Sequence, residues 1–128
     1  PLQASKIDQT VDFIAHHVGK WITTYFFQEI VKKVFDGGEP DSAAIEEAAK
    51  FLSQQLPYLD GLLADNDFLC GTEISIADCV AFAMIMAHEY TSFEIKDYKN
   101  ICRWYDQMKA RPSHQAMMKH FPGGYSFG

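Results

Sequence analysis

Histidine and cysteine side chains are the most obvious candidates for chemistry in this chain. The sequence holds five histidines and three cysteines, Cys70, Cys79 and Cys102. His16 and His17 are adjacent, so on a helix their side chains point about 100° apart and cannot chelate a metal from one face. No H-E-x-x-H or C-x-x-C spacing occurs in the sequence. The pattern predicts no metal site.

All three cysteines lie beside apolar segments that read as core, where a thiol stays protonated and unreactive. One sequence leaves a Cys–His nucleophile pair open, but inert thiols are the simpler interpretation, and we predict no catalytic residue in this chain. An odd number of cysteines favours free thiols in a reducing compartment, which predicts a cytoplasmic protein.

Ser75 and Asp78 have the Ser-x-x-acid spacing of a capping box at the start of a helix. We expect the Ser75 hydroxyl to accept from the Asp78 amide, and the Asp78 carboxylate to accept from the Ser75 amide. Ile74 and Cys79 are placed to close a hydrophobic staple around this cap. Asp78 also suits the role of a buried catalytic acid, but capping accounts for it fully, so we assign both residues a structural role.

The segments that position these residues read as helices. The capped helix, about 76–90, is apolar nearly all round, so it is predicted to lie in the core. Apolar residues recur every three or four positions over 5–35, with Gly19 marking a bend or a close backbone approach. The further predictions are a helix capped by Asp41 or Ser42 with a kink or restart at Pro57, helices over 97–110 and 113–120, and a flexible tail over 121–128.

These helices predict an all-α fold, with a bundle of about five helices around the buried, N-capped central helix. The 128 residues, 48% of them hydrophobic, are enough to form a single helical domain over residues 1–128. The net charge of −6 argues against nucleic acid and anionic membranes as partners, because both need a basic surface. No apolar run approaches the roughly 18 residues of a membrane-spanning helix.

Two motifs resemble the C-terminal, all-helical domain of glutathione S-transferases. The first is the Gly71–Asp78 pattern G-x-x-x-S-x-A-D, preceded by Phe68-Leu69-Cys70-Gly71. The second is the series Tyr98, Ile101, Trp104, Met108 and Arg111-Pro112. With the opening helix, the resemblance covers about residues 5–118. It departs from the family at Lys99, where proline is frequent, and at Pro57, which interrupts a helix that is usually continuous.

The resemblance implies that a thioredoxin-like N-terminal domain precedes this one in a longer protein. That domain would bind glutathione, the co-substrate, and would supply the residue that activates its thiol. The chain begins at Pro1 without an initiator methionine and shows no βαβ pattern, so we expect a piece of such a protein that is inactive alone. A homodimer and a role in detoxification are further implications of the resemblance.

In such proteins the helical domain supplies the apolar wall that binds a small hydrophobic electrophile. By spacing, His16, Lys20, Thr23 and Phe27 share one face of the first helix, with Trp21 beside it. We predict that these five residues bind substrate. The alternative for an aromatic stripe at helical spacing is core or interdomain packing.

Three functions remain open at this point. The first is the electrophile-binding half of a glutathione transferase, where the aromatic face positions the acceptor. The second is a non-catalytic protein-interaction module, like the similar domains of translation elongation factors and aminoacyl-tRNA synthetases. The third is a non-enzymatic relative that regulates or stores a ligand. The aromatic face favours the first. Tyr125 and Phe127 are expected to form either a lid over the cleft or part of the tail.

Overall fold

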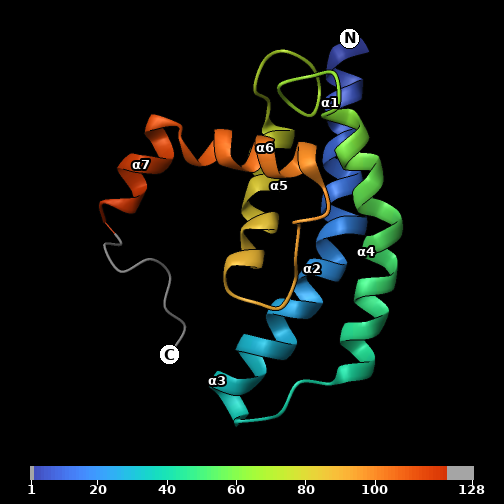
Figure 1. Cartoon of the computed structure of the whole chain (residues 1–128), viewed down its shortest axis with the longest axis vertical. Coiled ribbons are helices and arrows are strands. Elements are labelled where there is room, and N and C mark those ends of the chain that lie inside the picture. Colours follow the sequence, from blue (N-terminus) through green and yellow to red (C-terminus); the bar gives the residue numbers. More distant parts are fainter. Residues whose placement is uncertain (1, 121–128) are drawn as a thin grey trace.

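The computed structural model describes residues 2–120, which fold into helices joined by short loops (Figure 1). The first five elements run end to end as one long rod: α1 (Leu2–Phe13), η1 (Ile14–Val18), α2 (Gly19–Phe26), η2 (Phe27–Val31) and α3 (Lys32–Asp36). The other elements are α4 (Ser42–Leu62), α5 (Ile76–Ile85), η3 (Met86–Glu89), α6 (Lys99–Lys109) and α7 (Pro112–Met118). Within residues 2–120 there is no strand, so the all-α prediction is confirmed.

The rod confirms the predicted helix 5–35 and extends it slightly at both ends. It contains two π-helical turns, η1 and η2, which the sequence pattern does not predict. The rod ends where Gly37 adopts φ +68° and its amide donates to the Lys33 carbonyl at 3.1 Å, a left-handed cap that glycine adopts without strain. At Gly19, where a bend or a close backbone approach is predicted, an added Cβ would lie 2.9 Å from the Ile14 carbonyl oxygen and 3.4 Å from the Met84 side chain of α5.

Helix α4 lies along the rod and contacts α2 (Figure 1). Asp41 is its N-cap, and the Asp41 side chain accepts from the amides of Ala43 and Ala44, as predicted. The predicted restart at Pro57 is wrong, because α4 continues through this residue to Leu62. The neighbours Leu56 and Leu59 are both buried, so packing on either side of the proline holds the helix together despite the missing N–H donor.

Helix α5 is the central helix, and the predicted capping box is present at its N-terminus. The carboxylate of Asp78 is fully buried and accepts four hydrogen bonds. Oδ1 accepts from the Leu69 amide and the Trp104 indole N–H, each at 2.9 Å. Oδ2 accepts from the Ser75 amide at 2.9 Å and from its hydroxyl at 3.3 Å. One side chain thereby joins the loop before α5, the α5 cap and α6.

Helix α5 lies in the core as predicted, with Ala77, Ala81 and Ile85 buried, but one side of it reaches the surface. Small residues face the core on α5, where Ala77 and Ala81 are buried, whereas Ile76 is 60% exposed. Cys79 is exposed too, so its predicted place in the core is wrong. Short side chains let the rod approach α5 closely, and the larger ones are displaced to its sides. The α-helix also ends at Ile85, and a 3-10 turn continues it to Glu89.

Helices α6 and α7 complete the bundle. The motif residues Ile101, Trp104 and Met108 are all buried on α6, and the predicted last short helix is present as α7. Asp60 of α4 accepts from the amides of Asn100 and Ile101 at 3.0 Å each, so α4 caps the start of α6. The predicted tail over 121–128 lies outside the described residues, as do Tyr125 and Phe127. A search of the described residues finds no helix with the length and apolar character to cross a bilayer.

Asp78→Ala should lower the free energy of unfolding by about 3 kcal/mol. It leaves the Leu69 amide and the Trp104 indole N–H buried without an acceptor, at about 1–3 kcal/mol for each unmet donor. Ser75→Ala, which removes only the cap hydroxyl, should cost about 1 kcal/mol. Urea unfolding followed by circular dichroism measures both. Equal losses in the two variants would contradict the four-donor role of Asp78.

Gly19→Ala should destabilise the protein, although alanine normally favours a helix over glycine by about 1 kcal/mol. The new Cβ would lie 2.9 Å from the Ile14 carbonyl oxygen, and backbone cannot yield as a flexible side chain can, so a loss of about 1–3 kcal/mol is expected. Gly61→Ala in α4 is the matched control, because its Cβ meets nothing within 4 Å and should stabilise by about 0.5 kcal/mol. A gain of stability in Gly19→Ala as well would refute the predicted clash with the Ile14 carbonyl oxygen.

Candidate functional site

Four of the five predicted substrate-binding residues come together where the rod faces the start of α4. Lys20, Trp21, Thr23 and Phe27 line a hollow of about 410 Å³ that α4 completes. His16 is exposed but is not among the residues that line this hollow. The substrate-binding role of these residues stays a prediction.

The aromatic ring at the centre of this face already contacts the rest of the protein. Trp21 stacks on Phe51 of α4, with ring centroids 4.4 Å apart and planes 5° from parallel. The Lys20 ammonium lies 4.7 Å from the Trp21 ring centroid, within the range of a cation–π contact. Trp21 therefore packs within the protein, as the alternative interpretation of this aromatic face expects. The Phe27 side chain, in contrast, remains 49% exposed.

A larger cavity, of about 600 Å³, lies on the other side of the bundle between α5–η3, α6 and α7, and we call it the α5–α7 cavity. Apolar side chains dominate its wall. They are Phe26, Ile74, Phe82, Ala83, Met86, Ala87, Met108 and Met117, with Cys79, Tyr90, Arg111, Ser113 and His114 completing it. The volume lies within the range of small-molecule sites, and methionines suit a wall that adapts to differently shaped ligands.

The sequence reasoning missed this cavity because its wall comes from four separate segments. The methionines were the available signal, since Met86, Met108 and Met117 follow one another on three successive elements. Cys79, predicted to be an inert core thiol, is exposed and lines the cavity instead.

The polar groups of the cavity lie mainly at the start of α7. Among the described residues, Arg111 is the one lysine or arginine that lines the cavity, and no aspartate or glutamate of this range lines it. The His114 ring meets Phe82 edge-on at 5.3 Å, and its Nδ1 is buried without a hydrogen-bond partner among the described residues.

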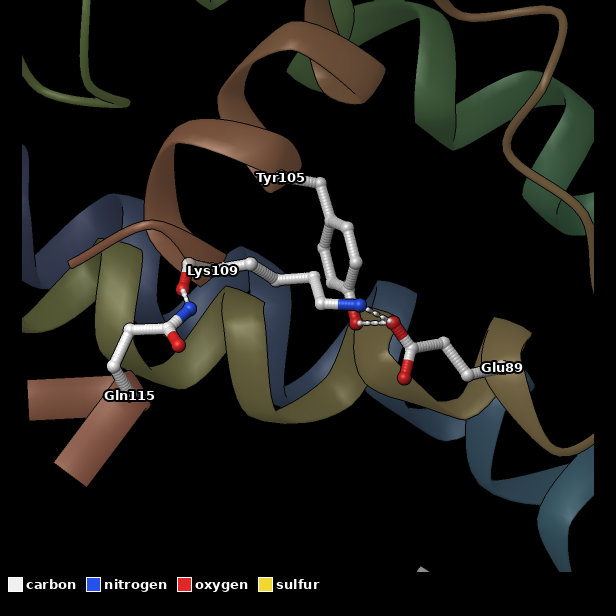
Figure 2. A network of polar contacts seen from close by, with 4 residues as sticks. All are labelled: Glu89, Tyr105, Lys109 and Gln115. Atoms are coloured by element: carbon white, nitrogen blue, oxygen red, sulfur yellow. Dashed lines mark hydrogen bonds and ion pairs between the residues drawn. The ribbon is translucent and has the colours of Figure 1, made fainter. Parts of the chain in front are cut away.

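A second polar cluster links η3 to α6 (Figure 2). The Tyr105 hydroxyl and the Lys109 ammonium both donate to Glu89 Oε1, at 2.9 and 2.6 Å, and Gln115 Nε2 donates to the Lys109 carbonyl at 2.8 Å. Burial and the bond to Glu89 raise the pKa of Tyr105. Burial opposes ionisation of Glu89, but the bonds from Lys109 and Tyr105 outweigh it and lower the Glu89 pKa. Both shifts move titration away from neutral pH, which suits a structural clamp rather than proton transfer.

No group of three or more histidine, cysteine, aspartate or glutamate side chains in the described part of the chain is arranged to hold a metal ion.

A family model described as "Glutathione S-transferase, C-terminal domain" matches residues 13–112. The chain belongs to this family. The family resemblance indicated by the two sequence motifs is thereby confirmed.

Two relatives illustrate the range of the family. FtsZ-localized protein A of Caulobacter vibrioides is 30% identical over 98 residues, which are 75% of this chain and 43% of that protein. Glutathione S-transferase 3 of Zea mays is 26% identical over 122 residues, 93% of this chain and 54% of that protein. The chain thus spans about half the length of the curated relatives it matches.

Solved structures confirm the fold. A glutathione S-transferase III in apo form matches with a TM-score of 0.83 at 23% identity, over 96% of this chain and 57% of that one. FzlA from C. crescentus matches with a TM-score of 0.82, also at 23% identity, over 93% of this chain and 54% of that one.

Acid should weaken the contact between η3 and α6 through His88. Its ring meets the Tyr105 ring at 4.6 Å and its Nε2 is buried without a partner among the described residues. Burial lowers the His88 pKa from 6.5, with Lys109 adding to the shift and Glu89 and Asp106 opposing it. The unfolded chain therefore takes up a proton near pH 6.5 that the folded chain does not, so stability is full above that pH and falls below it.

Urea unfolding at several values between about pH 5 and pH 8 measures this dependence. His88→Phe and His88→Gln, which cannot take up the proton, should both flatten the slope. The Glu89 contribution is separate, because it is lost only below that group's ordinary pKa of 4.5. An unchanged slope in both variants would show that His88 does not cause the acid sensitivity.

Proposed function

We propose that this domain is the acceptor-binding half of a glutathione transferase, with the apolar electrophile in the α5–α7 cavity. The observation that carries the proposal is a cavity of about 600 Å³ with a mostly apolar wall, in a chain of the glutathione S-transferase C-terminal family. An apolar electrophile transferred from water to such a wall gains about 25 cal/mol for each Å² buried.

In this proposal, a thioredoxin-like domain binds glutathione and activates its thiol. The helical domain then contributes proximity and orientation, because holding the acceptor near the thiolate replaces a bimolecular encounter with a bound geometry. A cytoplasmic location, a detoxification role and a homodimer accompany this function. The chain alone is expected to be inactive.

Two observations favour the α5–α7 cavity over the predicted face of the rod. The cavity is larger, about 600 Å³ against 410 Å³. A larger cavity removes more of the acceptor's surface from water. On the predicted face, the Trp21 ring is already stacked on Phe51, so binding there would gain little from its aromatic surface. Lys20, Thr23, Phe27 and His16 remain the alternative acceptor surface.

A protein-interaction module is the second candidate function. It is favoured by the similarity to FtsZ-localized protein A, whose name describes localisation to another protein. The exposed side chains Val34 and Phe35, 59% and 85% accessible, lie at the end of the rod where a partner would reach them.

The acceptor site can be located with 1,3-dinitrobenzene, an unreactive analogue of a chloronitrobenzene acceptor, in titrations of the chain followed by NMR. Ala83 is exposed and lines the α5–α7 cavity, so Ala83→Trp should fill the cavity and weaken binding at least about tenfold, or about 1.4 kcal/mol. Thr23→Trp, which fills the hollow on the predicted face, is the matched control and should leave binding unchanged.

The reverse result, in which Thr23→Trp alone weakens binding, would overturn the cavity assignment in favour of the predicted face. No binding to the parent chain at millimolar probe would count against acceptor binding altogether and favour the interaction module. Turnover of glutathione with 1-chloro-2,4-dinitrobenzene by the chain alone would contradict the division of labour between the two domains.

A further inference from the structure

Arg111 differs from the other arginine of the chain in what its side chain contacts. The second arginine of the chain, Arg103, donates from Nη2 to the carbonyls of Leu63 and Asn66, both at 2.9 Å, and so closes the end of α4. The Arg111 guanidinium has no hydrogen bond or ion pair with any residue of the described range, 2–120. It is half-buried and lines the α5–α7 cavity.

A second pocket, of about 430 Å³, lies beside η3 and α6, and Glu89, Glu94, Lys96 and Lys109 are among the residues that line it. Its two lysines are neutralised by the protein itself, since Lys109 lies 2.6 Å from Glu89 and Lys96 lies 2.8 Å from Glu94. Residues 2–120 supply no such counter-charge to the α5–α7 cavity, because no acidic residue of this range lines it. In a chain with net charge −6, this cavity therefore presents an uncompensated positive charge beside an apolar wall.

A second polar atom of the same cavity is also unused. His114 Nδ1 is buried and has no hydrogen-bond partner among the described residues, and a buried polar group without a partner is costly. The Arg111 guanidinium provides the donors for one acidic group, while the rest of the wall suits an apolar body.

We infer that the cavity selects an apolar acceptor bearing a carboxylate, and that Arg111 is the residue that determines this specificity. The inference rests on the proposed function, because it names the class of acceptor that the proposed site binds. A carboxylate fits better than a neutral polar group, since the planar guanidinium pairs with its two oxygens in a bidentate arrangement. The low polarity of the wall strengthens that pairing relative to an exposed ion pair.

The test compares two probes with the same apolar body, 3,5-dinitrobenzoate and 1,3-dinitrobenzene, in titrations of the chain followed by NMR. The carboxylate should bind at least about tenfold more tightly than the neutral probe, the range expected for a charge-assisted hydrogen bond. Arg111→Met should abolish this preference, so that the two probes bind with about equal affinity. Arg111→Lys should retain part of it, because a point charge remains without the bidentate geometry.

Lys50→Met is the matched control, since it also removes one positive charge, from an exposed position of α4 outside the cavity. It should leave the ratio of the two affinities unchanged. Circular dichroism of each variant verifies that the fold is kept.

The outcomes separate this inference from the proposed function. Binding of the neutral probe without any preference for the carboxylate would overturn the role of Arg111 and leave the acceptor site intact. An equal loss of both probes in Arg111→Met would also overturn it, because the residue would then be shaping the cavity. Failure of both probes to bind the parent chain would refute the proposed function itself.

Discussion

The structure depends on the satisfaction of one buried carboxylate. Asp78 is fully buried, and an isolated carboxylate in such a place would be very costly. Its oxygens receive the Leu69 amide and the Trp104 indole at 2.9 Å, and the amide and hydroxyl of Ser75. These donors come from the preceding loop, the helix cap and α6, so the carboxylate is satisfied only when all three are in place. The interaction thus makes the local cap and the tertiary packing mutually dependent.

That dependence explains where the large side chains of α5 go. With α5 fixed by its buried cap, the rod contacts α5, on which Ala77 and Ala81 are buried. Phe82 and Met86 then lie to the side and become part of the wall of the α5–α7 cavity. The cavity is in this sense a consequence of the close contact between rod and central helix, since the side chains excluded from that contact need another surface.

The features that the sequence predicts best are the ones with local causes. The Ser75–Asp78 box, the Asp41 cap and the helix end at Gly37 each depend on residues within a few positions, and all three are observed. The Trp104 bond to Asp78 spans 26 positions and has no local signal. The buried face of α5 was not predictable either, because a helix that is apolar nearly all round carries no periodicity to distinguish Ala77 from the exposed Cys79.

The candidate site was the least predictable part for a related reason. Helical spacing identifies residues that share a face of one element, which is why Lys20, Trp21, Thr23 and Phe27 do surround a common hollow. Helical spacing does not identify a cavity wall whose residues lie far apart in the sequence, such as Phe26 and Met117. Nor does it distinguish the two arginines, because only the tertiary structure directs Arg103 to the carbonyls of Leu63 and Asn66 and leaves Arg111 beside an apolar cavity. A charge becomes available for a ligand when the fold supplies no counter-charge, and that depends on what packing brings near it rather than on its neighbours in sequence.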